Sequence, residues 1–215
     1  MKVTIALILI NTLVFFYMVF FTQPDEFVKK YGFDAKKFLD GEYYRMITAI
    51  FLHASIAHLA SNIVALFFIG LPIENKFGKV KFLFTYFLSG IAGNASMLLP
   101  WFNSRIGIGA SACISGLVGM GTFALPLKFV LFPSFIPFPF VVAGAIYLLV
   151  NLANLFEVSK IAYHAHLAGL LTGSIVGLAF TSNRKKKVIG FMILLLFLST
   201  FPLFAGYFLE FLIKE

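Results

Sequence analysis

Seven uncharged, strongly apolar stretches divide the sequence, and each is long enough to cross a lipid bilayer. A membrane-spanning helix needs about 20 apolar residues, and the stretches occupy residues 3–22, 46–73, 82–104, 106–127, 129–156, 161–183 and 188–209. Charged residues make up only 12% of the chain, whereas a soluble domain has about 25%. We therefore predict an all-α integral membrane protein, a polytopic helical bundle that forms one domain over residues 1–215. The first stretch is too long for a signal-peptide core and is expected to be retained.

The net charge of +8 is interpreted as a topology signal, so no nucleic-acid partner is expected. Basic residues collect in cytoplasmic loops of membrane proteins, and the densest run is 184–187. With that run inside, short inner loops hold nine basic residues: Lys2, Lys76, Lys79, Lys81, Lys128, Arg184, Lys185, Lys186 and Lys187. Short outer segments hold Arg105, Lys160 and Lys214. We predict a multi-pass protein of the cell membrane with its N-terminus in the cytoplasm and its C-terminus outside.

Four polar residues are expected at similar depth within three of these stretches. Polar and ionisable side chains inside a membrane are costly and are candidates for function. Under the predicted topology the second, fourth and sixth stretches all run inward from the outer face. Ser111 and His166 then lie about one turn into their helices, while His58 and Asn62 share a face of the second.

Serine, histidine and asparagine together suit acyl transfer. A serine hydroxyl becomes a strong nucleophile once an imidazole accepts its proton, and the resulting oxyanion needs hydrogen-bond donors. Ser111 and His166 are the candidate nucleophile and base, and the Asn62 amide and a second imidazole are candidate donors. No carboxylate lies near His166 in the sequence, which favours a dyad over a triad.

A dyad requires the fourth and sixth stretches to pack backbone against backbone, and small residues allow this. The fourth stretch offers Gly109, Ala112, Ser115, Gly116 and Gly119, and the sixth offers Ala165, Ala168, Gly169 and Gly173.

Other interpretations of single residues remain open. Ser111 alone is typical of a helix N-cap or a packing residue, and Asn62 of an interhelical hydrogen bond. His53 and His164, nearer the outer ends, are expected to be interfacial or structural. A metal site is an alternative for the histidines, but no Cys, Asp or Glu ligand lies nearby, so we predict no metal and no cofactor.

The ordered set of motifs resembles the rhomboid family of intramembrane serine proteases. His53-x4-His58-x3-Asn62 followed by Gly70 is similar to the family's motif in the second span. Gly109-Ala110-Ser111 resembles its nucleophile motif, and Ala165-His166-x2-Gly169-x3-Gly173 its base motif. Tyr44-Arg45 resembles the aromatic-Arg pair of the first loop, and Glu74 an acidic residue at the inner end of the second span.

The resemblance implies a six-helix core, about residues 1–183, plus one C-terminal transmembrane helix at about 188–209. It implies cleavage of transmembrane-helix substrates near the outer membrane face. Ser111 would be the nucleophile and His166 the base and then the acid, while His58, Asn62 and the Ser111 backbone N–H would form the oxyanion hole. The first loop would lie in the outer leaflet, and the fifth span with the loop near 156–163 would gate substrate access.

Two positions depart from the family pattern. Ala112 replaces the glycine that commonly follows the nucleophile, and because alanine is small, activity is expected to survive. Ser115 stands where the family often has an aromatic residue stacked on the base. The imidazole is then held less firmly, or Ser115 hydrogen-bonds it instead.

Three functions compete. The leading hypothesis is an active intramembrane serine endopeptidase, whose partners are transmembrane substrates and membrane lipid. The alternative is a catalytically inactive relative that binds membrane proteins for quality control, although such relatives typically lack the Ser or the His. A small transporter or channel is the third, but it predicts internal repeats and usually an intramembrane carboxylate, and neither is visible in the sequence.

Overall fold

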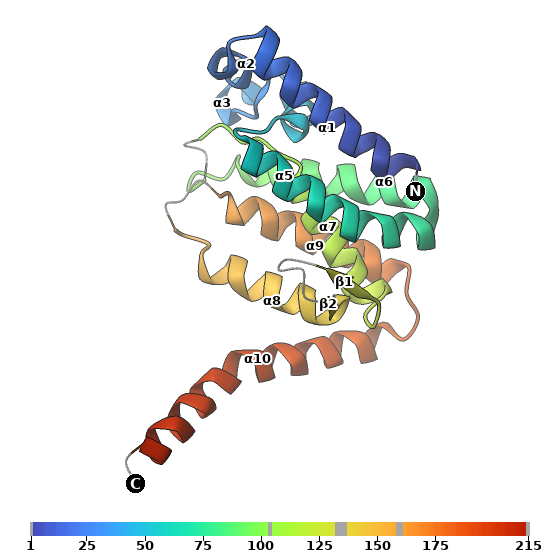
Figure 1. Ribbon diagram of the computed structural model, residues 1–215, viewed down its shortest axis with the longest axis vertical. Helices are drawn as coiled ribbons and strands as arrows, with labels where there is room; N and C mark the ends of the chain where they lie inside the picture. The colour runs from blue at the N-terminus through green and yellow to red at the C-terminus, as the bar shows by residue number, and fades with distance from the viewer. Residues whose placement is uncertain (1, 103–104, 132–136, 158–160, 214–215) are drawn as a thin grey trace.

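The chain folds almost entirely into helices, as predicted. A computed structural model describes residues 2–102, 105–131, 137–157 and 161–213. The elements in chain order are α1 (Lys2–Phe21), α2 (Pro24–Tyr31), α3 (Ala35–Leu39), α4 (Arg45–Thr48), η1 (Ala49–Phe51), α5 (Ile56–Ala65), η2 (Leu66–Gly70), α6 (Leu71–Ser96), α7 (Ser111–Ala124), β1 (Phe129–Leu131), β2 (Pro137–Pro139), α8 (Phe140–Ala153), α9 (Tyr163–Ala179) and α10 (Arg184–Ile213). Helix α7 lies in the middle of the bundle, and α10 extends away from it (Figure 1).

Two stretches of described helix are both long and apolar enough to cross a membrane by themselves. One is α1, and the other is the 41-residue run Ile56–Ser96. That run is not one straight rod. Gly78 breaks it with φ 77° and ψ 171°, a backbone conformation that glycine adopts without steric cost. The segment η2 is a single π-helical turn within the run.

Several predicted spans are longer than the helices that form. The span predicted at 46–73 begins its main helix only at Ile56, after the short α4 and η1. The span predicted at 106–127 contracts to α7, and the one at 129–156 contracts to α8. Hydropathy counts any apolar residue, so it included loop and hairpin residues that are apolar without being helical.

An antiparallel β-hairpin precedes α8. Strand β1 pairs with β2, with Phe129 opposite Pro139 and Leu131 opposite Pro137. Proline disfavours the interior of a helix, and Pro137 and Pro139 lie in β2 rather than in α8. Pro133 lies outside the described residues.

Helix α7 is too short to cross the hydrocarbon core of a bilayer. Helix α7 has 14 residues, so at about 1.5 Å per residue it is roughly 21 Å long, less than the ~30 Å hydrocarbon core. Non-helical backbone at membrane depth is tolerated where it is enclosed by protein or lines a cavity. The N-terminal end of α7 therefore lies inside the protein, where a polar site is possible.

Helices α7 and α9 approach until their backbones touch. A Cβ added at Gly173 would lie 1.8 Å from the carbonyl oxygen of Gly116, and one at Gly169 would lie 2.2 Å from that of Ala112. At Gly177 the nearest atom would be the Met120 carbonyl oxygen at 2.6 Å. Only glycine fits at this spacing, which agrees with the close packing expected from the sequence.

Helix α1 is fixed to the bundle through its first turn. The Glu74 carboxylate accepts hydrogen bonds from the backbone N–H groups of Val3, at 3.1 Å, and Thr4, at 2.8 Å. It also accepts one from the Thr4 hydroxyl at 2.7 Å. The first N–H groups of a helix have no partner within it, and a negative charge there complements the helix dipole. Glu74 thus caps α1.

The start of α10 is tied to the end of α7. The Lys187 ammonium donates a hydrogen bond to the Phe123 carbonyl oxygen at 2.9 Å and contacts the Thr181 hydroxyl. Phe123 also packs edge-on against Phe191, with ring centroids 5.1 Å apart. The carbonyl groups at a helix C-terminus favour a cation, so this contact supports the docking of α10.

Adding a methyl group at the α7–α9 contact is expected to destabilise the fold. Gly173→Ala should lower the thermal midpoint of the detergent-solubilised protein, because overpacking costs about 1–3 kcal/mol. Gly190→Ala is the matched control, because a Cβ there meets nothing within 4 Å. It should leave the midpoint unchanged or raise it. An unchanged midpoint for Gly173→Ala would show that the two helices can separate at little cost.

Candidate active site

Ser111 and His166 meet across the contact between α7 and α9. Ser111 is the first residue of α7, and His166 lies in the first turn of α9. The Ser111 Oγ lies 2.8 Å from His166 Nε2, within hydrogen-bond distance for proton transfer. The contact of Gly169 with the Ala112 carbonyl brings the two helix starts together. Sequence reasoning expected this pair to meet.

A third side chain reaches the other nitrogen of the imidazole. The Asn151 Oδ1 of α8 lies 3.0 Å from His166 Nδ1, and Asn151 is buried, with 2% of its surface exposed. Sequence reasoning missed this residue because it searched for a carboxylate near His166. An asparagine on another helix, outside any spacing motif, gave no signal.

Ser115 does not take the place of the missing aromatic ring. Its hydroxyl donates a hydrogen bond to the Ser111 carbonyl oxygen at 2.7 Å, so its single proton is not offered to the imidazole. The Tyr147 hydroxyl of α8 lies 2.7 Å from the Ser115 Oγ. The Tyr147 ring lies beside His166, with centroids 6.1 Å apart. An aromatic side chain therefore stands near the imidazole, but it comes from α8.

His58 and Asn62 lie on α5 beside the serine. The Asn62 Nδ2 donates to the His58 carbonyl oxygen at 2.9 Å, which uses one of its two N–H bonds. Gly109, just before the serine, has φ 114°, and a Cβ there would lie 2.8 Å from His58 Nε2. Glycine at position 109 thus allows both the turn into α7 and the close approach of the imidazole.

The two remaining histidines make packing contacts. His53 is fully buried, with its ring centroid 4.9 Å from that of His58. His164 Nδ1 lies 2.8 Å from the Ser96 hydroxyl, and its ring stacks on Phe102 at 4.1 Å. Among the described residues, neither His53 nor His164 forms a hydrogen bond with Ser111.

Two cavities meet at the Ser111–His166 pair. One, of about 830 Å³, is lined by apolar side chains such as Trp101 and Phe102 together with polar ones that include His58, Arg105 and Glu157. The other, of about 330 Å³, lies between α5 and α8 and is lined mainly by apolar side chains such as Ile114 and Ile146. Both are lined by Ser61, Asn62, Ser111, Ile161, Tyr163 and His166. The pair thus borders one cavity of mixed polar and apolar lining and one that is almost entirely apolar.

Among the described residues, no group of three or more His, Cys, Asp or Glu side chains is placed to hold a metal ion. The two ring nitrogens of His166 contact a serine hydroxyl and an asparagine amide.

The family model for the Rhomboid domain matches residues 40–183. The chain belongs to the rhomboid family. Rhomboid protease AarA of Providencia stuartii is 28% identical over 203 residues, covering 82% of this chain and 72% of the relative. Putative rhomboid protease YdcA of Bacillus subtilis is 32% identical over 148 residues, covering 69% and 71%.

Rhomboid-like protease 3 of Toxoplasma gondii is 44% identical over a shorter segment of 87 residues, which covers 40% of this chain and 32% of that relative. The chain therefore spans about a third of the length of this relative, and most of the length of the two bacterial ones. The family and the names of these relatives support the predicted enzyme class, an intramembrane serine protease.

The alanine at the family's glycine position is accommodated by the helix opposite. A Cβ added at Gly93 of α6 would lie 2.4 Å from the Ala112 Cβ. The methyl group of Ala112 therefore occupies space that a side chain at position 93 would otherwise fill. Glycine at position 93 therefore leaves room for the Ala112 methyl group beside the α7–α9 contact.

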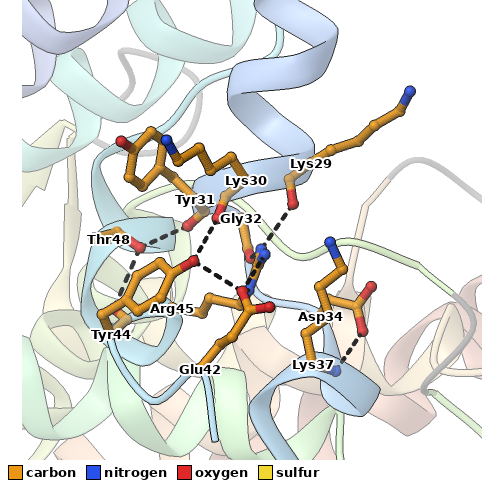
Figure 2. A network of polar contacts seen from close by, with 10 residues as sticks. All are labelled: Lys29, Lys30, Tyr31, Gly32, Asp34, Lys37, Glu42, Tyr44, Arg45 and Thr48. Carbon is orange, nitrogen blue, oxygen red and sulfur yellow. Dashed lines mark hydrogen bonds and ion pairs between the residues drawn. The ribbon is translucent and has the colours of Figure 1, made fainter. Parts of the chain in front are cut away.

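Tyr44 and Arg45 form hydrogen bonds to other residues of the segment between α1 and α4 (Figure 2). Arg45 is 1% exposed, and its Nη1 donates to the carbonyl oxygens of Lys29, at 2.8 Å, and Gly32, at 2.7 Å. Its Nε donates to the Glu42 carboxylate at 2.7 Å. The guanidinium thus satisfies carbonyl groups at the end of α2, where a cation is favoured.

Tyr44 shares the Glu42 carboxylate with Arg45. The Tyr44 hydroxyl donates to Glu42 Oε2 at 2.8 Å, and it lies 3.1 Å from the Lys30 carbonyl oxygen. Hydrogen bonds from Tyr44 and then from Arg45 lower the pKa of the Glu42 carboxyl below its ordinary value. The same contact raises the pKa of the Tyr44 hydroxyl.

The Arg45 contacts predict a loss of stability when the guanidinium is replaced. In Arg45→Lys one ammonium group cannot reach both carbonyl groups and Glu42, and losing hydrogen bonds to a charged group costs about 1.5–3 kcal/mol. The thermal midpoint in detergent should fall. Lys36→Ala, which removes an exposed cation of the same loop, should leave it unchanged. Equal midpoints for Arg45→Lys and the wild type would mean that the charge alone suffices.

The pKa of Glu42 sets the pH range of this contribution. Because the folded-state pKa is lowered, the stabilisation is fully present above the ordinary carboxyl pKa, near 4.5, and is lost as the pH falls through the folded value. Arg45→Lys should therefore cost less stability at pH 3 than at pH 7.

Proposed function

We propose that this chain is an intramembrane serine endopeptidase that uses Ser111 as nucleophile and His166 as general base and acid. The single observation that carries the proposal is the 2.8 Å separation of Ser111 Oγ and His166 Nε2 at the junction of two cavities. Membership of the rhomboid family supports it. An inactive relative is not favoured, because both residues are present and in contact.

The reaction follows from this pair. As the Ser111 oxygen bonds to the substrate carbonyl carbon, His166 Nε2 takes the hydroxyl proton. The tetrahedral intermediate collapses when the C–N bond breaks, and His166 gives that proton to the leaving amine. Water then attacks the acyl-enzyme and loses a proton to His166 Nε2, and His166 returns that proton to the Ser111 oxygen as the ester C–O bond breaks. No metal or cofactor is required.

The oxyanion formed at each step needs donors beside Ser111. We assign this role to the Asn62 amide, the His58 imidazole and the Ser111 backbone N–H. Asn62 and His58 line the larger cavity together with Ser111. The second Asn62 N–H is not used by the His58 carbonyl. The N-terminal end of α7 adds its dipole to the stabilisation of negative charge.

The larger cavity supports a route for water. Hydrolysis in a membrane requires water at the acyl-enzyme, and the lining of this cavity includes Arg105 and Glu157. The smaller, apolar cavity between α5 and α8 suits a substrate segment that arrives from lipid. We propose that α8 and the loop near 156–163 gate this access; residues 158–160 of that loop lie outside the described part of the chain.

The proposed architecture is one membrane domain with a six-helix core of about residues 1–183 and a seventh span provided by α10. In the core, α6 contributes to two spans because it is broken at Gly78. We propose that the N-terminus is cytoplasmic and the C-terminus outside, on the distribution of basic residues. Ser111 then lies toward the outer face, and the cleavage sites are near that face.

Substrates are proposed to be transmembrane helices that unwind easily. A helix in lipid satisfies all its backbone groups internally, so the scissile bond becomes accessible only after local unwinding. We propose Gly, Ala, Pro or Ser near the outer end of the substrate span, because Gly, Pro and Ser are poorer helix formers and Ala, like Gly, leaves the backbone open to close approach.

Cleavage in liposomes with Ser111→Ala as the paired variant tests the proposal. The wild type should cleave a test substrate and react with a fluorophosphonate probe, and both activities should vanish in Ser111→Ala, because no other hydroxyl faces His166 Nε2 among the described contacts. His166→Ala should abolish cleavage too. A folded wild type that neither cleaves nor reacts would sink the protease proposal and favour the binding-factor alternative.

The same assay tests the substrate class. A matched substrate in which every small or helix-weakening residue of the outer half is replaced by Leu should be cleaved at least about tenfold more slowly. Equal rates for the two substrates would contradict the unwinding requirement and leave the catalytic assignment untouched.

Asn62→Ala tests the oxyanion assignment. Removal of one oxyanion donor typically lowers kcat by about 10²–10³, so Asn62→Ala should lower kcat by that amount with little change in KM. Asn154→Ala, the same substitution at an amide that donates to the Val150 carbonyl oxygen, should retain wild-type kcat. Equal kcat values for Asn62→Ala and Asn154→Ala would remove Asn62 from the site.

A further inference from the structure

The contacts of Asn151 fix which way its amide points. The Asn151 Nδ2 lies 2.7 Å from the Tyr147 carbonyl oxygen, and a carbonyl oxygen only accepts hydrogen bonds. The nitrogen must therefore face Tyr147, because the reverse orientation would place two acceptors against each other. The Oδ1 atom is consequently the one that faces His166 Nδ1, at 3.0 Å.

This orientation determines the tautomer of the imidazole. Since Oδ1 can only accept, Nδ1 must carry a hydrogen. In neutral His166 the proton is then absent from Nε2, whose lone pair points at the Ser111 hydroxyl 2.8 Å away. That is the form a general base needs. With the proton on Nε2 instead, the imidazole would donate to Ser111 and could not accept its proton.

We propose that Asn151 is a positioning residue that holds His166 as the Nδ1–H tautomer with Nε2 free to accept the Ser111 proton. The proposal rests on the proposed protease function. Asn151 acts through the imidazole and does not touch the reacting atoms. Ser111, His166 and Asn151 thus form a row of hydrogen-bonded side chains. In this row the Asn151 amide accepts the Nδ1 hydrogen bond that a carboxylate would accept in a catalytic triad.

Burial makes the contact effective. Asn151 is 2% exposed, so water does not compete well for its Oδ1 atom, and an imidazole hydrogen bond is stronger in such surroundings than in water. Tyr147, one turn earlier on α8, supports the arrangement, because its carbonyl orients the amide and its hydroxyl bonds to Ser115. Helix α8 therefore supplies the groups that orient the base, whereas α7 and α9 supply the nucleophile and the base.

The test compares Asn151→Leu, which keeps the size but removes the acceptor, with Asn151→Asp, which keeps an acceptor toward Nδ1 whether the carboxyl group is charged or protonated. Asn151→Leu should lower kcat by at least about tenfold, with KM within about twofold of wild type, as is typical when an outer partner of a functional histidine is lost. Asn151→Asp should recover most of that loss. Asn154→Leu, at the residue that directly follows α8, is the control, and its kcat and KM should equal those of the wild type.

A spectroscopic measurement reads the tautomer without reference to activity. In ¹⁵N-histidine-labelled wild type, the His166 signals, identified by their absence in His166→Gln, should show a protonated Nδ1 and an unprotonated Nε2. In Asn151→Leu they should move toward a mixture of the two tautomers. A wild type with the proton on Nε2 would overturn the proposal even if Asn151→Leu does not fold.

The outcomes separate the two levels of inference. A folded wild type without cleavage contradicts the protease function. A wild type that cleaves, with Asn151→Leu equally active and its tautomer unchanged, contradicts the role of Asn151 alone. Equal losses in Asn151→Leu and Asn151→Asp would also overturn it, because the retained acceptor would then have no effect.

Discussion

The contact between the backbones of α7 and α9 controls the rest of this structure. Three glycines of α9 face carbonyl groups of α7 at distances where a Cβ has no room. In lipid, helices gain little from burying apolar side chains against one another, so close packing has to supply the attraction. A spacing set by backbone atoms is also hardly adjustable. It holds Ser111 and His166 at hydrogen-bond distance, which longer and more variable side chains between the helices would not do.

The short length of α7 solves a second problem, which is how water reaches a site at membrane depth. A helix that spanned the bilayer would begin near the outer surface and place its first residues there. Because α7 begins inside the protein, Ser111 borders a cavity of about 830 Å³ that polar and apolar side chains line together. Gly109, shortly before the start of α7, has a positive φ of 114°. The non-helical backbone at 106–108, which hydropathy could not distinguish from a helix, lines the same cavity.

The sequence was sufficient to predict features that depend on long apolar stretches or on regularly spaced small residues. Apolar stretches predicted the helical bundle, and the small residues around Ser111 and His166 predicted that their helices pack closely. It overestimated helix lengths at 46–73, 106–127 and 129–156, because the loops and the hairpin in these ranges are as apolar in sequence as spans. Asn151 could not be found this way. Its role depends on a rotation of α8 that brings one amide, out of several in the chain, against His166.

Asn151 lies on α8, the helix that borders the apolar cavity. The orientation of the His166 imidazole therefore depends on the position of α8. His166 and Ser111 are fixed to each other by the α7–α9 contact, but the Nδ1 partner belongs to a helix whose N-terminal end follows a small hairpin and whose outer side carries α10. A displacement of α8 large enough to widen the cavity beside Ile146 would lengthen the Asn151–His166 hydrogen bond. The imidazole would then lose the constraint on its tautomer while keeping its distance to Ser111. The proposed gate for the substrate and the proposed partner of the base therefore belong to the same helix.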